Sequence, residues 1–227
     1  GGFSLYVRQH CPDTPGQVDK PPFHLPLALG LLDADGADLP LSLPGESTPG
    51  PTTRVLEVRE SEQIFVFEGI TRRPRMSLLR GFSAPVKLRV EESDEDLMFL
   101  MARDSDDFCR WDAAQRLAGK LLRQLISAHQ AGQPMSIPAG FIDAFRTALL
   151  DPRADQALLA EVLTLPSELD LGEQMQIIDV EAIHWAREGL KSILARELRE
   201  ELQQTYSTNL EAGPYEFSPG AIGRRAL

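Results

Sequence analysis

Three spacings in this chain place residues where they could bind a metal ion or act as a nucleophile. The first is an acidic run, Asp33, Asp35 and Asp38, of the kind that begins a calcium loop. An EF-hand loop also needs Gly at its sixth position and Glu at its twelfth, which here are Asp38 and Pro44. The run therefore predicts a hairpin turn rather than a calcium site.

The second spacing is the Glu-x-x-His step formed by Glu181 and His184. Di-iron bundles use two such steps and two further carboxylates on facing helices, and this sequence has no second step. We interpret His184, next to Trp185 on a mostly apolar helix, as a partly buried helix residue. His129 lies on the predicted apolar face of another helix, so we interpret it as a packing residue.

The third spacing is the segment Gly45–Gly50, which misses the G-x-S-x-G nucleophile elbow by one residue and is not followed by a helix. The sequence contains no G-x-G-x-x-G, P-loop or H-E-x-x-H pattern. No two of its four histidines have the spacing of metal ligands. We therefore predict no catalytic, cofactor-binding or metal-binding residue in this chain.

Charge and composition exclude further classes of protein. The chain has 34 Asp and Glu against 23 Lys and Arg, a net charge of −11, whereas a nucleic-acid surface needs clustered cations. No apolar run approaches the roughly 20 residues of a membrane span. Cys11 and Cys109 indicate two free thiols in a reducing compartment, although a single bridge between them stays open. We expect a cytoplasmic protein without nucleic-acid or membrane partners.

The first part of the chain predicts a small immunoglobulin-like β-sandwich, assigned to residues 1–92. Residues 1–90 contain 11 of the 17 prolines and 9 of the 17 glycines, so turns are frequent. Between them, apolar and polar residues alternate with the period of a strand. The predicted strands, about seven, lie at 3–8, 23–32, 39–43, 54–58, 63–68, 77–82 and 86–91.

From Ser93 onward the period is that of helices, and we assign residues 93–227 to the opening part of a solenoid-like helical domain. One helix begins after Ser93, and another begins at Ser218 and Pro219. The others are predicted near 106–132, 139–150, 154–163 and 180–205. The apolar face of the 106–132 helix comprises Trp111, Ala114, Ala118, Leu122, Leu125 and His129. That of the 180–205 helix comprises Ile183, Leu190, Leu194, Leu198 and Leu202.

The junction of the two parts is acidic. Residues 91–107 contain eight carboxylates and one cation, Arg103, which accounts for −7 of the net charge of −11. Acidic side chains favour helix N-termini, so we interpret this run as a solvated junction that caps the adjacent helices rather than as a metal site.

Several segments resemble the bacterial aminopeptidase N family of zinc metallopeptidases. The most specific strings are FSAPVKL at residues 82–88 and RWDAAQ at residues 110–115. Further matching segments, in the same order, are 65–68, 107–109, 143–151, 160–167 and 177–179. The resemblance runs from Leu5 to about Arg225.

The resemblance implies a place within a longer enzyme. The family has four domains, and this chain resembles the third, a β-sandwich, followed by the first helices of the fourth. The zinc ligands of the family lie on H-E-x-x-H and a downstream Glu in the second domain, and no position here matches them. We therefore expect a non-catalytic fragment without a cofactor, in a zinc-dependent parent that removes N-terminal residues from peptides.

In that parent the fragment is expected to act as a spacer and as a wall of the substrate chamber. Its expected partners are the catalytic and remaining helical domains, with peptides as the parent's substrates. An exposed apolar patch, or self-association, is expected beside Leu194, Leu198 and Leu202. The alternative is a free-standing β-sandwich module with a helical appendage, which binds a protein or a carbohydrate.

Overall fold

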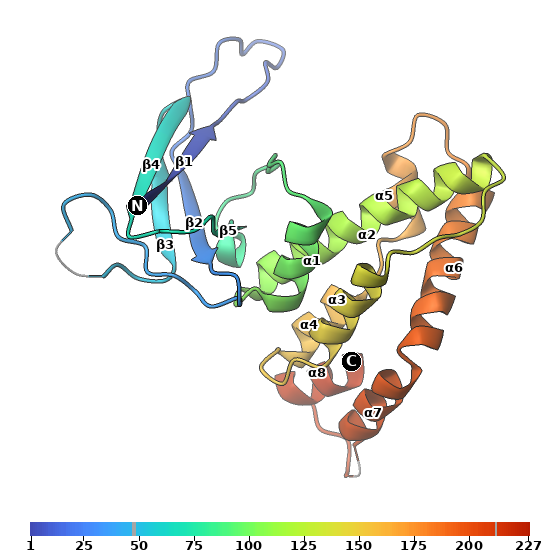
Figure 1. Cartoon of the computed structure of the whole chain (residues 1–227). Coiled ribbons are helices and arrows are strands. Elements are labelled where there is room, and N and C mark those ends of the chain that lie inside the picture. Colours follow the sequence, from blue (N-terminus) through green and yellow to red (C-terminus); the bar gives the residue numbers. More distant parts are fainter. Residues whose placement is uncertain (47–48, 212) are drawn as a thin grey trace. The chain divides into compact units, whose positions relative to one another are not determined.

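The computed structural model describes residues 1–46, 49–211 and 213–227 (Figure 1). These residues form two compact units, Gly1–Val90, built of strands, and Glu91–Leu227, built of helices. Within the described residues, no helix combines the length and the apolar character that crossing a membrane requires.

The first unit contains two small antiparallel sheets, with strand orders β1-β4 and β3-β2-β5. The strands that the described residues form are β1 (Gly2–Arg8), β2 (Leu25–Leu32), β3 (Arg54–Val58), β4 (Glu62–Glu68) and β5 (Arg75–Leu78). In the first sheet, Gly2 lies opposite Glu68 and Arg8 lies opposite Glu62.

The core of this unit follows the predicted alternation. In β1, Leu5 is buried while its neighbour Tyr6 is exposed, as the pleat of a strand requires. Strand β2 differs, because its residues from Leu27 onward are buried on both faces, as expected of the central strand of a sheet. The buried apolar side chains include Leu5, Leu27, Leu29, Leu31, Leu41, Leu56, Val58, Phe67 and Ile70.

One charged side chain, Arg80, is buried beside β2. Its guanidinium donates to Ser77 Oγ at 2.8 Å, to Thr53 Oγ1 at 2.7 Å and to Asp38 Oδ1 at 2.6 Å. The guanidinium lies directly over Gly30 of β2, where a Cβ atom would collide with it. The absence of a side chain at Gly30 therefore makes room for the buried cation.

We predict that Gly30→Ala destabilises the protein by about 1–3 kcal/mol, the usual cost of overpacking, because Arg80 is held by three partners and cannot move without breaking them. Urea unfolding of the single variants and of the Gly30→Ala/Arg80→Leu double variant measures this. The cost of Gly30→Ala should shrink in the Arg80→Leu background. An unchanged cost would mean that Arg80 is not the obstacle.

Two of the predicted strands do not form. Segment 39–43 contains Pro40, and it meets the sheets through an isolated bridge between Ser42 and Glu68 and through a backbone hydrogen bond from Leu39 to Leu31 of β2 at 2.8 Å. Segment 86–91 forms no strand, because no neighbouring chain segment pairs with it, and Val86 and Leu88 are exposed. The segment predicted at 77–82 leaves the sheet after Leu78 and ends in the 3-10 turn Arg80–Phe82.

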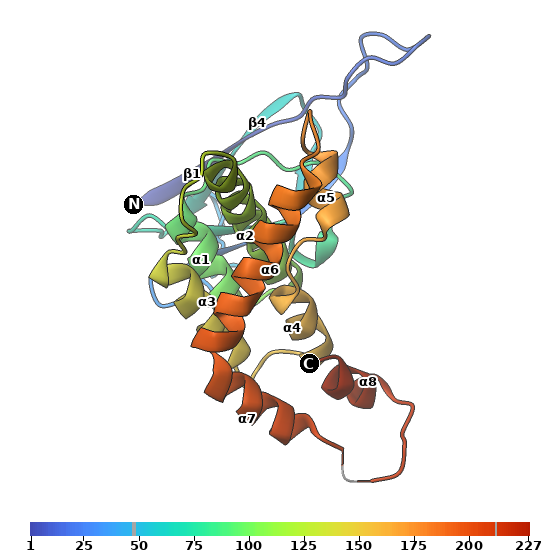
Figure 2. The same ribbon diagram turned by 90° about the vertical axis from the view of Figure 1, so that its right-hand side faces the viewer.

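The second unit consists of helices packed in pairs (Figure 2). The helices of the described residues are α1 (Asp94–Arg103), α2 (Asp107–Gln130), α3 (Ala139–Leu149), α4 (Gln156–Leu163), α5 (Glu168–Glu173), α6 (Val180–Glu197), α7 (Arg199–Asn209) and α8 (Pro219–Ala226). Helix α2 packs against α1, α4 and α6, and α3 packs against α1 and α4.

The helix ends follow local chemistry. Ser93 forms a capping box with Asp96 at the start of α1, Asp106 caps α2, and Ser218 caps α8, each as the sequence indicates. The short helix α5 was not predicted, although Ser167 and Asp170 form a second capping box there. Helix α5 has only six residues, too few to display the apolar period of a helix.

The helix predicted at 180–205 is interrupted at Leu198, whose φ of −113° departs from helical values. Arg146 of α3 lies against this bend, where it donates to the backbone oxygen of Glu197 at 3.4 Å and to Glu201 Oε1 at 2.8 Å. A side chain that bonds a helix carbonyl is a known cause of a kink. We attribute the separation of α6 from α7 to this contact.

The expected apolar patch beside Leu194, Leu198 and Leu202 is wrong for two of the three residues. Leu194 and Leu198 are buried, and only Leu202 is partly exposed, at 38%. The reason is that α6 packs on α2 while α7 turns at the bend to pack on α3.

We predict that Leu198→Ala lowers the free energy of unfolding by about 2–5 kcal/mol, because it leaves a cavity in a closed site. Leu202→Ala removes the same atoms from a partly exposed site and serves as the matched control, with a cost of about 1 kcal/mol or less. Chemical denaturation compares the two. Equal costs would contradict the burial of Leu198.

Candidate functional site

The acidic run at Asp33 forms a turn, as predicted. Asp33 Oδ1 accepts hydrogen bonds from the backbone N–H groups of Asp35 and Ala37, each at 2.9 Å, and these bonds lower the pKa of Asp33. Asp38 is engaged elsewhere, in the ion pair with Arg80. Asp33 and Asp38 therefore serve different partners, and no cation-binding group forms here among the described residues.

The histidine at the Glu-x-x-His step is exposed, so the expectation of a partly buried His184 is wrong. Ala182, Ile183 and Ala186 take the inward positions of α6, which turns His184 toward solvent. Its Nδ1 lies 2.9 Å from Glu168 Oε1, in an exposed contact between α6 and α5.

His129, predicted to lie on an apolar face, is also exposed, although its ring stacks on Trp185 with a centroid separation of 4.4 Å. This contact joins the ends of α2 and α6. Trp111, assigned to the same face, is exposed, with 36% of its surface accessible. The other four residues of the predicted face, Ala114, Ala118, Leu122 and Leu125, are buried as expected, and Leu117, Leu121 and Ile126 are buried beside them.

The segment Gly45–Gly50 lies partly outside the described residues, because these omit 47 and 48. Of the described part, Glu46 forms an ion pair with Arg54 at 2.8 Å. Glu46 also accepts the backbone N–H of Leu43, and that bond together with Arg54 lowers its pKa. Glu46 thus links the backbone at Leu43 to Arg54 at the start of β3 within the first unit.

The acidic run 91–107 caps helices, as predicted, but it is not wholly solvated. Glu92 is largely buried against Arg116, and burial raises its pKa while the cation opposes the rise. Asp104 is buried at the end of α1 and accepts the backbone N–H of Asp106 at 3.0 Å. Burial also raises the pKa of Asp107.

The second unit contains a buried ion pair that the sequence does not predict. Arg110 of α2 lies 3.1 Å from Asp151, in the turn after α3, and both side chains are more than nine-tenths buried. Arg110 also donates to the backbone oxygen of Met101 at 3.3 Å. Because 41 positions separate the two partners, no local pattern could have identified the pair.

The same carboxylate has an unusual electrostatic environment. Burial pushes the pKa of Asp151 upward, but hydrogen bonds from Arg153 and the charges of Arg110 and Arg153 outweigh burial. The net result is a pKa below the ordinary value of an aspartate. Asp151 therefore stays ionised and ties α2 to the turn between α3 and α4.

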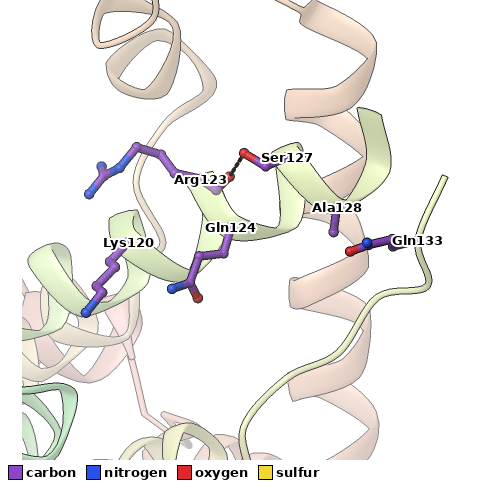
Figure 3. Close-up of a pocket in the computed structure, with 6 residues that line it drawn as sticks. All are labelled: Lys120, Arg123, Gln124, Ser127, Ala128 and Gln133. Carbon is purple, nitrogen blue, oxygen red and sulfur yellow. Dashed lines mark hydrogen bonds between the residues drawn. The ribbon is translucent and has the colours of Figure 1, made fainter. Parts of the chain in front are cut away.

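Two open hollows on the surface of the helical unit are formed by described residues. The first, of about 430 Å³, lies along α2 and is lined by Lys120, Arg123, Gln124, Ser127, Ala128 and Gln133. Figure 3 shows Lys120 and Gln124 pointing to one side of α2 while Arg123 points to another. Lys120 pairs with Asp94 at 2.5 Å, and Arg123 donates to the side chain of Gln174. These polar groups diverge rather than meet at one ligand.

The second hollow, of about 780 Å³, lies where the end of α2 meets the connection between α5 and α6. It is lined by Gln130, Met175, Gln176, Ile177, Ile178, Asp179, Val180 and Glu181. Its lining combines exposed aliphatic side chains with carboxylates, which suits contact with a surface better than it suits acid–base chemistry.

The described residues do not fit a zinc site. No group of three or more His, Cys, Asp or Glu among them could hold a metal ion, and the pair of His184 and Glu168 offers only two ligands. A zinc site in proteins needs at least three protein ligands. Both cysteines are free, Cys11 partly exposed and Cys109 buried.

The chain matches two family models. Residues 94–227 match DUF3458_C, a domain of unknown function with ARM repeats, and residues 1–91 match DUF3458, a domain of unknown function with an Ig-like fold. These matches confirm the expected fold class, an Ig-like domain followed by a helical repeat domain. The described residues contain five strands rather than about seven.

Similar proteins are aminopeptidases. Aminopeptidase N of Escherichia coli is 43% identical over 99% of this chain and 25% of that protein, and aminopeptidase N of Haemophilus influenzae is 33% identical over the same shares. The crystal structure of Legionella pneumophila aminopeptidase A in complex with aspartic acid has a TM-score of 0.76 and 28% identity, over all of this chain and 25% of that one. The chain thus spans about a quarter of the length of these relatives.

We predict that Asp151→Ala lowers the free energy of unfolding by about 3–5 kcal/mol, because it leaves Arg110 charged, buried and without its counter-ion. Asp143→Ala is the control, since Asp143 is largely exposed in its pair with Arg146 and should cost about 1 kcal/mol or less. Urea unfolding at pH 7 measures both. A loss no larger than that of the control would contradict a buried pair.

The pH dependence of the stability follows from the lowered pKa of Asp151. The pKa of Asp151 is lower in the folded chain than in the unfolded chain, so its stabilisation is present above about pH 4 and is lost as the pH falls below that value. The stability difference between the wild type and Asp151→Asn should therefore shrink between pH 5 and about pH 3. A difference that stays constant would contradict the lowered pKa.

Proposed function

Since the chain belongs to the DUF3458_C family, with a DUF3458 Ig-like domain before it, we propose that it serves as a non-catalytic part of a zinc-dependent aminopeptidase. The resemblance to the bacterial aminopeptidase N family is confirmed by relatives that align with 99% of the chain. This alignment, which runs through both units, is the observation that carries the proposal.

Zinc in such an enzyme would activate water for hydrolysis of the N-terminal peptide bond. This chain supplies no zinc ligands in the proposal, and its residues act by position. The proposed partners are the catalytic and remaining helical domains of the longer polypeptide, with peptides as substrates. The two free cysteines support a reducing, cytoplasmic location.

The β-unit is proposed to act as a spacer. A spacer must transmit position without bending, which requires a core of its own. Residues such as Leu29, Leu31 and Phe67 are fully buried, and the Arg80 network ties β5 to both ends of the connection between β2 and β3. These features support a rigid body between two larger domains.

The helical unit is proposed to act as part of the wall of a substrate chamber. Stacked helix pairs of repeat proteins form extended curved surfaces, and their stability comes from contacts between neighbouring pairs. Here α2 contacts α1, α4 and α6, so the wall is held by several neighbours. A wall of this kind selects substrates by limiting the room for the peptide rather than by chemistry.

An activity assay tests whether this chain is the non-catalytic part of an active longer polypeptide. The chain alone, supplied with zinc, should not hydrolyse an alanyl anilide, whereas the longer polypeptide should do so and should lose activity with a chelator. Turnover by the chain alone that a chelator removes would overturn the proposal. Recovery of a specific protein or carbohydrate partner, with an inactive longer polypeptide, would favour a free-standing binding module instead.

The spacer and wall roles need a second experiment. The proposal places the domain boundary at residues 92 and 93, so a six-residue Gly-Ser insertion after Glu92 in the longer polypeptide should displace the wall. The expected result is a change of about tenfold in kcat/KM for peptides of several residues, with less than a threefold change for an alanyl anilide. The same insertion after the exposed Gly16 is the control. Equal effects on both substrates would contradict a wall.

A further inference from the structure

An apolar cluster on α5 and on the connection between α5 and α6 is left largely uncovered by the described residues of its unit. Ile177 is 84% exposed, Val180 is 66% exposed and Ile178 is 59% exposed, and Leu169 of α5 lies 71% exposed in the same part of the chain. Ile177, Ile178 and Val180 line the second hollow. Figure 1 shows the connection that carries them between α5 and the start of α6. We call these four residues the α5–α6 patch.

The patch is held in a fixed shape rather than carried by a loose loop. Asp179 caps α6 through the backbone N–H of Ala182 at 3.0 Å, and Gln130 of α2 donates to the other oxygen of Asp179 at 2.9 Å. The backbone N–H of Met175 donates to the oxygen of Gly172 at 3.0 Å. Both ends of the connection are therefore anchored, which lowers the entropy cost of binding.

The segment that carries the patch is acidic, although the cation of Arg123 lies against Gln174 at its start. Residues 168–181 contain five carboxylates and no Lys or Arg. Four of these are exposed, Glu168, Asp170, Glu173 and Glu181, of which Glu173 and Glu181 stand nearest in sequence to Ile177. An apolar centre with a charged rim is the ordinary anatomy of a protein interface. An acidic rim favours a partner whose own rim is basic.

The same charge argues against a second copy of this chain as the occupant. A two-fold dimer would place each patch against itself, and so would bring two acidic rims together in a chain of net charge −11. The relatives, by contrast, are about four times as long as the region they share with this chain. They contain ample further surface to cover the patch.

We propose that the α5–α6 patch docks into an apolar pocket bordered by Lys or Arg on another domain of the longer aminopeptidase polypeptide. This inference rests on the proposed function and names the surface through which the helical unit is positioned. Ile177 is the central side chain of the contact, and Glu173 and Glu181 form its charged rim.

Amide hydrogen exchange of residues 176–178 tests the docking. In the longer polypeptide these amides should exchange at least tenfold more slowly than in this chain alone, and Ile177→Asp should abolish the difference. Val18→Asp is the matched control, because Val18 is a β-branched residue, 70% exposed, in a loop of the other unit. Equal rates in the chain and in the longer polypeptide would overturn the proposal.

Two charge-reversal variants test the contribution of the acidic rim to the docking. Glu181→Lys in the longer polypeptide should reduce the protection of the same amides at least threefold, while Glu161→Lys, an equal charge change on exposed α4 surface, should leave it unchanged. Equal effects of the two variants would contradict a partner pocket bordered by Lys or Arg. Protection that rises with the concentration of this chain alone would instead identify a second copy as the occupant.

Two measurements separate this inference from the proposed function. Ile177→Asp should leave the urea midpoint of the isolated chain unchanged, since the side chain is exposed there. The aminopeptidase activity of the longer polypeptide is measured in the same preparation. An active polypeptide without protection at 176–178 refutes the docking alone, whereas an inactive polypeptide refutes the proposed function.

Discussion

The helical unit depends on burying the apolar sides of one long helix, α2. Its side chains Leu117, Leu121, Leu122, Leu125 and Ile126 are all buried, and α1, α4 and α6 pack around it. The polar side of the same helix holds the α5–α6 connection, through Arg123 to Gln174 and Gln130 to Asp179. One helix therefore sets both the core of the unit and the position of its exposed apolar patch.

Each unit also encloses one buried arginine that joins distant segments. Arg80 binds Ser77, Thr53 and Asp38, and Arg110 binds Asp151 and the backbone of α1. Such groups add little net stability compared with apolar packing, but an arrangement that leaves either cation unpaired is strongly disfavoured. They consequently define a single packing of each unit, which suits parts whose role is to hold other domains in place.

Much of the local structure could be predicted because its causes lie within a few residues. Strand β3 has the predicted bounds, and Ser93 and Asp106 cap helices where acidic first turns indicated. Segment 86–91 failed because alternation describes a strand only when another segment pairs with it. Of the candidate site, the turn at Asp33 could be predicted, since its hydrogen bonds span four residues. The exposure of His184 could not, because it depends on which face of α6 meets α2.

By itself, the sequence determined the order of a β-part and a helical part, most helix starts, and the resemblance to aminopeptidases, because periodicity, capping and strings such as RWDAAQ are properties of neighbouring residues. Only the tertiary structure decided the bend at Leu198, the pairing of Arg110 with Asp151, and the exposure of Ile177. Each of these depends on groups tens of positions apart in the chain. Whether such groups meet is settled by packing, since burial and long-range electrostatics have no period that a sequence displays.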